Sequence, residues 1–156
     1  MLAILKRITR RRGKGEDGQS LVEFAFVLPI FLLVLFAIID FGMAFHAWIA
    51  VTSSAREGGR LGAVHPSLEA AGSPCFGEGS LAQCIENRVR DTAGSIGDDL
   101  EVNVTNADGM PGESVVVDVS YVYTLITPMA NMLDIVSHGT IDDTFTLSSS
   151  ADYRLE

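Results

Sequence analysis

A long apolar run near the N-terminus dominates the pattern of hydrophobic and polar positions. From Leu21 to Ile39 every residue is apolar except Glu23. About 20 apolar residues in a helix span a bilayer core. The run therefore predicts a transmembrane helix rather than a buried core helix, which a chain of 156 residues could hardly cover. Pro29 lacks a backbone donor and is expected to bend this helix.

The predicted helix is longer than a membrane is thick. Apolar character continues to Val51, and Leu21–Val51 would measure about 46 Å as a helix, against a hydrocarbon core of about 30 Å. Beyond the membrane, Phe41, Phe45 and Trp48 follow i, i+4, i+7 spacing and share one packing face. Either the chain's own head covers this face, or other subunits of an assembly do.

Three glycines further along lower the helix propensity. Gly58, Gly59 and Gly62 each cost about 1 kcal/mol relative to Ala, and we expect them to end the stalk or to form a hinge. His65-Pro66 then breaks the helix. The sequence thus divides into a basic leader, a transmembrane and stalk helix, and a head, with bounds at residues 1–18, 19–64 and 65–156.

The head has the pattern of an α+β fold. Ser80 is the expected N-cap of a helix that reaches Ile96, with Gln83 as its capping-box partner. Apolar and polar residues alternate on both sides of the turn-rich Asn106–Gly112, as in a β-hairpin. We expect one helix on a three- or four-stranded, mainly antiparallel sheet, with strands at Leu100–Thr105, Glu113–Ile126 and Thr140–Ser149 and a short helix or loop at Thr127–Val136.

Cys75 and Cys84 lie close together in the sequence of the head. Outside the cytoplasm, two such cysteines indicate a disulfide. The pair does not form a CxxC redox motif, and no nearby His or Lys would activate either thiol. We therefore expect a structural disulfide.

Charge sets the orientation and excludes several functions. The net charge is −9 and no basic stripe is present, which argues against nucleic-acid binding. Most basic residues precede the apolar run, so the positive-inside rule places the N-terminus in the cytoplasm and residues after about 52 outside. A secretory signal cut near Ser53-Ser54-Ala55 is the less favourable alternative, because the apolar stretch far exceeds an ordinary signal core.

The sequence lacks motifs that carry chemistry. It contains no Ser-His-Asp grouping, Gly-rich phosphate loop, HExxH or paired-carboxylate motif. We therefore expect neither enzymatic activity nor a small-molecule substrate. Two cysteines and three scattered histidines exclude a Cys/His-rich metal fold, and the acidic pairs lack EF-hand spacing, so we expect no cofactor and no metal.

The junction between the leader and the apolar run carries the sharpest signal. Glu23 is a lone carboxylate just inside an apolar helix, where a charge needs a partner. Cleavage between Gly18 and Gln19 would remove the basic leader and create an α-amine. This amine could pair with Glu23 of a neighbouring subunit, because a buried ion is tolerated when it is paired. The alternative is that Glu23 only snorkels to water.

Several motifs accompany this junction. They are Gly18, the stretch Gln19–Glu23 with Phe24 and Ala25 after it, Pro29, Asp40-Phe41-Gly42, and Ala55-Arg56-Glu57-Gly58-Gly59-Arg60. Together they resemble the TadE-like family, pseudopilins of the tight-adherence (Flp-type) pilus and secretion machinery. The resemblance covers about residues 15–64, with a weaker echo in the C-terminal strands. One departure is Gly58-Gly59, which stands where helix formers are expected.

The resemblance implies a pseudopilin or minor pilin. Its partners would be the lipid bilayer, a prepilin peptidase that cuts at Gly18, other pilin or pseudopilin subunits, and the pilus assembly platform. Its place would be the bacterial inner membrane, single-pass with the head outside, or an extracellular pilus. Two hypotheses remain beside it: a membrane-anchored binding or sensing module with an uncleaved anchor, and a small periplasmic enzyme. Neither gives a reason for the Gly18–Glu23 motif.

Overall fold

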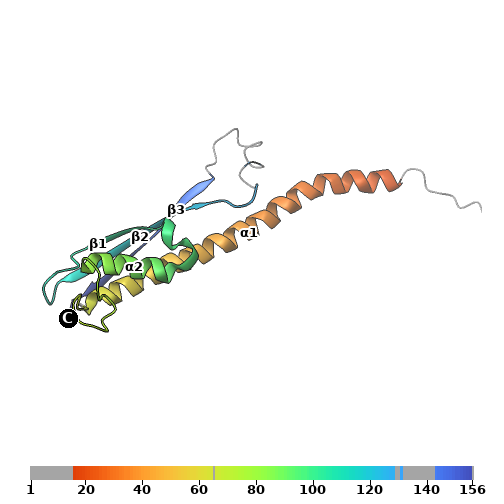
Figure 1. Ribbon diagram of the computed structural model, residues 1–156. Helices are drawn as coiled ribbons and strands as arrows, with labels where there is room; N and C mark the ends of the chain where they lie inside the picture. The colour runs from red at the N-terminus through yellow and green to blue at the C-terminus, as the bar shows by residue number, and fades with distance from the viewer. Residues whose placement is uncertain (1–15, 65, 129–130, 132–142, 156) are drawn as a thin grey trace, which may run out of the picture.

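The protein consists of one very long helix with a small α+β head packed on its C-terminal half (Figure 1). The computed structural model describes residues 16–64, 66–128, 131 and 143–155. Its elements are α1 (Glu16–Ala63), α2 (Leu81–Ala93), the 3₁₀ helix η1 (Gly94–Asp99), β1 (Glu101–Thr105), β2 (Ser114–Thr124) and β3 (Thr144–Arg154). The predicted fold class is confirmed.

Helix α1 has 48 residues, which corresponds to a length of about 72 Å. Pro29 lies inside the helix, and helical structure continues on both sides of it. Residues 18–39 are all exposed or half-buried, whereas the head packs on the segment from Asp40 to Gly62. Helix α1 therefore consists of two consecutive segments, a bare part before Asp40 and a covered part from Asp40 to Gly62.

The head is a three-stranded antiparallel sheet in the order β1-β2-β3, with α1 and α2 packed against the same face. The alternation predicted for β2 is confirmed, because Val115, Val117, Val119 and Tyr123 are buried on the helix side. The core between sheet and helices also contains apolar residues of both helices, among them Val51, Ala55, Leu61, Leu81, Ile85 and Val89.

The expectation that the glycines form a hinge is wrong, although α1 does end at Ala63, one residue after Gly62. Helix α1 runs through Gly58, Gly59 and Gly62 without interruption, and all three are buried. A Cβ on Gly58 would collide with Val89 of α2, and one on Gly59 would lie 2.5 Å from the ring of Tyr153. The glycines therefore let α2 and β3 approach the helix backbone closely, and this packing outweighs their low helix propensity.

Two predicted boundaries in the head are also wrong. The third strand is observed at Thr144–Arg154, not at Thr140–Ser149, because it pairs with the whole of β2, from Thr144 opposite Thr124 to Arg154 opposite Ser114. Helix α2 ends at Ala93 rather than Ile96, since Gly94 adopts a positive φ of 64° and the chain continues as η1. Most of the predicted segment Thr127–Val136 lies outside the described residues.

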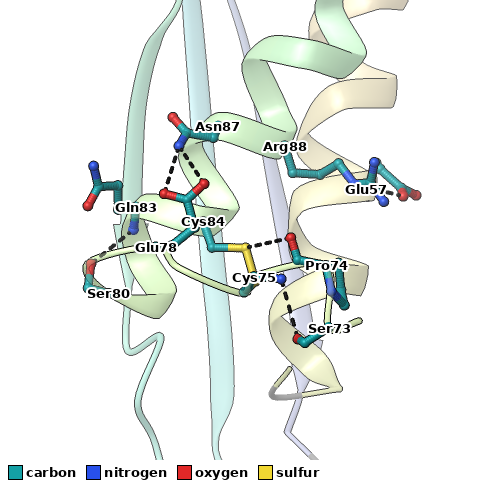
Figure 2. The surroundings of a disulfide bond; sticks show 10 residues. All are labelled: Glu57, Ser73, Pro74, Cys75, Glu78, Ser80, Gln83, Cys84, Asn87 and Arg88. Atoms are coloured by element: carbon teal, nitrogen blue, oxygen red, sulfur yellow. Dashed lines mark hydrogen bonds and ion pairs between the residues drawn. A yellow bond between two sulfur atoms is a disulfide. The ribbon is translucent and has the colours of Figure 1, made fainter. Parts of the chain in front are cut away.

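The expected disulfide joins Cys75 to Cys84, with Cα atoms 5.5 Å apart (Figure 2). It ties the loop after α1 to the first turn of α2, where the Ser80 hydroxyl accepts the backbone N–H of Gln83, as predicted for an N-cap. The side chain of Asn87 also holds the loop, by donating to both carboxylate oxygens of Glu78 at 3.1 Å. In the chain-entropy model a loop of this length gains about 2.5–3 kcal/mol from its disulfide.

Candidate assembly site

The proposed processing junction lies in the first turns of α1. Gly18 and Gln19 are exposed, and nothing within 4 Å would contact a Cβ on Gly18. The side-chain Nε2 of Gln19 donates to Oε1 of Glu23 at 3.0 Å, so residues 19 and 23 share one side of the helix. The amide leaves the negative charge of Glu23 uncompensated, because glutamine is neutral.

The bare part of α1 is an apolar surface on all sides. Phe24, the residue after Glu23, is exposed, and so are most of the large apolar side chains that follow it. Among the described residues, α1 from Gly18 to Ala63 is the one helix whose length and composition suit it to cross a membrane. The segment Gly18–Ile39 is about 33 Å long, close to the thickness of a bilayer core of about 30 Å.

The predicted packing face forms an aromatic ladder of Phe41, Phe45 and Trp48. The ring centroids of Phe41 and Phe45 lie 6.4 Å apart, and those of Phe45 and Trp48 lie 5.7 Å apart. All three side chains are exposed, Phe41 by 74%, so no described part of the head covers them. Ala47 and Val51, between and beyond them in sequence, are buried by the head, so this segment of α1 has one covered and one uncovered side.

Asp40 is a functional residue whose role the sequence did not reveal. The residue is only 2% exposed. Its Oδ1 accepts the backbone N–H groups of Ile126 at 3.0 Å and Thr127 at 3.2 Å, and its Oδ2 accepts the hydroxyl of Thr127. Asp40 therefore fastens the chain after β2 to α1, at the boundary between the bare and covered parts of the helix.

Tyr123 strengthens the same junction from the end of β2. Its hydroxyl donates to the backbone carbonyl of Asp40 at 3.3 Å. Burial, with a smaller effect of the negative charge on Asp40, raises the pKa of Tyr123 above its ordinary value of 10.0. The only local signal for this junction was a charged residue within an apolar helix, since its partners lie more than 80 positions away in sequence.

A groove of about 450 Å³ continues from the end of the aromatic ladder along the uncovered side of α1. The ion pair between Glu57 and Arg60, with 2.9 Å between oxygen and nitrogen, lies at one end of it. No hydrogen bond or ion pair joins Arg56 to the described part of the chain. This helix groove is lined by Trp48, Ile49, Thr52, Ser53, Arg56, Glu57, Arg60 and Tyr153.

The sequence could not reveal the helix groove, because Tyr153 reaches it from the far end of the chain. As for metals, no group of three or more His, Cys, Asp or Glu side chains with a suitable arrangement occurs within residues 16–64, 66–128, 131 and 143–155. The arrangement thus offers surfaces for packing and docking.

Comparison with known proteins supports this picture. Residues 18–60 match the family model described as TadE-like protein. The match begins at Gly18 and ends at Arg60, so it covers the motifs that carry the resemblance and confirms it. No curated protein and no solved structure matches the chain. The match and the membrane-length helix together indicate a membrane-anchored, pilus-associated protein.

Proposed function

We propose, with the TadE-like match of residues 18–60 as the premise, that this protein is a pseudopilin or minor pilin of a tight-adherence (Flp-type) pilus. The observation that carries the proposal is the bare part of α1. A single helix with large apolar side chains exposed on every side is stable only in lipid or against other apolar helices. Both environments are available to a subunit that waits in a membrane and is then assembled.

The proposed orientation has the basic leader in the cytoplasm and the head outside. The positive-inside rule favours this direction, because the basic residues cluster before the apolar run. The disulfide between Cys75 and Cys84 agrees with it, since disulfides persist in oxidising compartments outside the cytoplasm. The protein would then reside in the bacterial inner membrane as a single-pass protein, and in an extracellular pilus if it enters the fibre.

In this proposal a prepilin peptidase cuts between Gly18 and Gln19. The new α-amine on Gln19 supplies the positive charge that the Gln19 side chain lacks. When the N-terminal segments of several subunits pack together, the amine of one subunit pairs with Glu23 of its neighbour. This pairing favours ordered assembly over random contact of apolar helices, because an unpaired carboxylate in the bundle is strongly unfavourable.

The remaining partners and activities follow from the same role. Other pilin or pseudopilin subunits and the assembly platform would contact the bare part of α1 and the aromatic ladder. We propose no enzymatic activity, small-molecule substrate, nucleic acid, cofactor or metal for this protein. Its work would be mechanical, and would consist of joining a helical assembly and presenting a head.

The test is the N-terminal residue of the full-length protein after extraction from membranes. We expect Gln19 in the wild type, and an intact precursor when Gly18→Phe places a bulky side chain at the cut. Gly42→Phe is a matched control, since Gly42 lies in the same helix and also has open space around it. This variant should be cut normally. An intact Met1 in the wild type would instead favour a membrane-anchored binding or sensing module.

A further inference from the structure

An exposed aromatic side chain stands on the loop after α1. Phe76 is 59% exposed, although Cys75 before it is completely buried. The disulfide fixes Cys75 to α2, and the backbone N–H groups of Phe76 and Gly77 donate to carbonyls of Ser73 and Leu68, each at 3.2 Å. The backbone that carries Phe76 is therefore held in place by its own loop, and a pre-ordered backbone lowers the entropy lost on binding.

The loop that carries Phe76 is acidic in sequence. The loop at residues 66–80 contains Glu69 and Glu78 but no Lys or Arg. Glu69 is exposed and lies near Phe76, because Gly77 bonds to the carbonyl of the preceding Leu68. The loop thus presents an aromatic side chain beside a carboxylate.

The helix groove has complementary chemistry. Its walls include the rings of Trp48 and Tyr153, and Arg56 and Arg60 lie in the same groove. Aromatic residues and arginine are the types that contribute most to protein interfaces. The groove shares Trp48 with the aromatic ladder, so a subunit bound there would extend the contact surface that the exposed rings of the ladder offer.

The Phe76 loop lies outside the groove of its own chain. The groove is lined by residues 48–60 of α1 and by Tyr153, whereas the loop follows the C-terminal end of α1 (Figure 1). Phe76 is exposed, so it does not occupy the groove of its own chain. A contact between two different surfaces of identical copies leaves a free surface on each copy for the next one, and it builds a helical fibre when the rotation between copies does not close into a ring.

We propose that the helix groove binds the Phe76 loop of a second copy of this chain, with Phe76 between Trp48 and Tyr153 and Glu69 facing Arg56. This inference rests on the proposed function, which supplies parallel copies displaced along their helix axes. It goes beyond that function because it assigns a contact between heads, apart from the packing of the bare helices. The contact would set the displacement between neighbouring subunits.

Photo-cross-linking in cells that produce two forms of the full-length protein tests this contact. One form carries a photo-reactive phenylalanine analogue in place of Phe76, and the other carries an epitope tag. We expect cross-links from position 76 to residues 48–60 of the tagged copy. The control places the same analogue at Val122, which is about as exposed as Phe76 but lies on the face of the sheet that points away from the helices. This control should give about tenfold less cross-linked product.

Charge exchange adds a second readout. Arg56→Glu in the tagged copy should lower the cross-link about tenfold, and Glu69→Arg in the other copy should restore most of it. Formation of the Cys75–Cys84 disulfide in every variant shows that the head has folded. Equal yields from positions 76 and 122, cross-links that fall outside the groove, or cross-links only to a different protein would each overturn the proposal.

The two proposals fail in different ways. Processing at Gly18 and normal piliation without a cross-link from position 76 would remove the contact between heads and leave the pilin function intact. A cross-link into the groove in a protein that retains its leader would do the opposite, since copies would associate without maturing as pilins.

Discussion

Asp40 shows how a single side chain can join two parts of a protein. A carboxylate removed from water is tolerated when donors satisfy it, and Asp40 receives two backbone N–H groups and a hydroxyl from residues 126 and 127. In return, it satisfies the backbone of a segment that leaves the sheet. The side chain therefore fastens the segment after β2 to α1 at residue 40.

Removal of this carboxylate should destabilise the head. Asp40→Ala leaves the N–H groups of Ile126 and Thr127 without their acceptor, and we expect a loss of about 2–3 kcal/mol in the free energy of unfolding. Thermal unfolding of the full-length protein in detergent measures the change. Asp118→Ala is the matched control, because Asp118 is exposed on the outer face of the sheet, and its effect should stay within about 0.5 kcal/mol. Equal effects of the two variants would contradict the role of Asp40.

Tyr123 makes the same junction sensitive to alkaline pH. Because its pKa is raised in the folded protein, folding favours the protonated phenol. The stabilisation is fully present below the unfolded pKa of about 10 and is lost as pH rises through the folded pKa. In unfolding measurements at increasing pH, the wild type should lose stability above pH 10 more steeply than Tyr123→Phe. If stability falls with pH in parallel for the two proteins, ionisation of Tyr123 does not contribute to the loss of stability.

At the scale of elements, the contact between α1 and the head depends on the absence of side chains. Gly58 faces Val89 and Ile85 of α2, and Gly62 faces Ile85 and Val115. At both positions a Cβ would lie too close to side chains of α2 or the sheet. Helix propensity and packing therefore oppose each other along the same turn of α1.

Gly58→Ala separates these two effects. Alanine gains about 1 kcal/mol of helix propensity but places a methyl group against Val89, and overpacking typically costs about 1–3 kcal/mol. We expect a net loss of stability, measured by thermal unfolding in detergent. Gly42→Ala, on the same helix with open space around it, should be neutral or stabilising. A stabilised Gly58→Ala protein would mean that the helices can move apart at no cost.

The elements that could be predicted from the sequence are those with a local signal. The length of α1 follows from composition, and β2 follows from the alternation of Val115, Val117 and Val119. Strand β3 was misplaced because Ser148, Ser149 and Ser150 do not alternate, and its position is fixed only by pairing with β2. The roles of Gly58 and Asp40 were missed for a similar reason, since their partners are remote in sequence and only the fold brings them together.

The whole molecule combines a membrane part and a head on one continuous helix. If the proposed pairing is correct, Glu23 acts only between molecules, and its loss should spare the fold. Glu23→Ala should be cut at Gly18 and folded, with an intact disulfide, but should fail to join pili. Purified pili probed for this subunit and for its mature N-terminus provide the measurement.

Gln19→Ala is the control that isolates the charge. It removes the side chain that donates to Glu23 but keeps the α-amine of the mature N-terminus, so processing and assembly should both continue. If Gln19→Ala fails to assemble as Glu23→Ala does, the hydrogen bond within one chain matters, and the pairing between subunits loses its support. Normal assembly of Glu23→Ala would have the same consequence.

The uninterrupted course of α1 through its glycines has a mechanical consequence. Successive residues of an α-helix are rotated by about 100° around its axis. With no flexible joint between the bare and covered parts, any twist of the rod within the lipid turns the head by the same angle. If the proposed assembly is correct, packing between neighbouring α1 helices would therefore also set the direction in which each head faces.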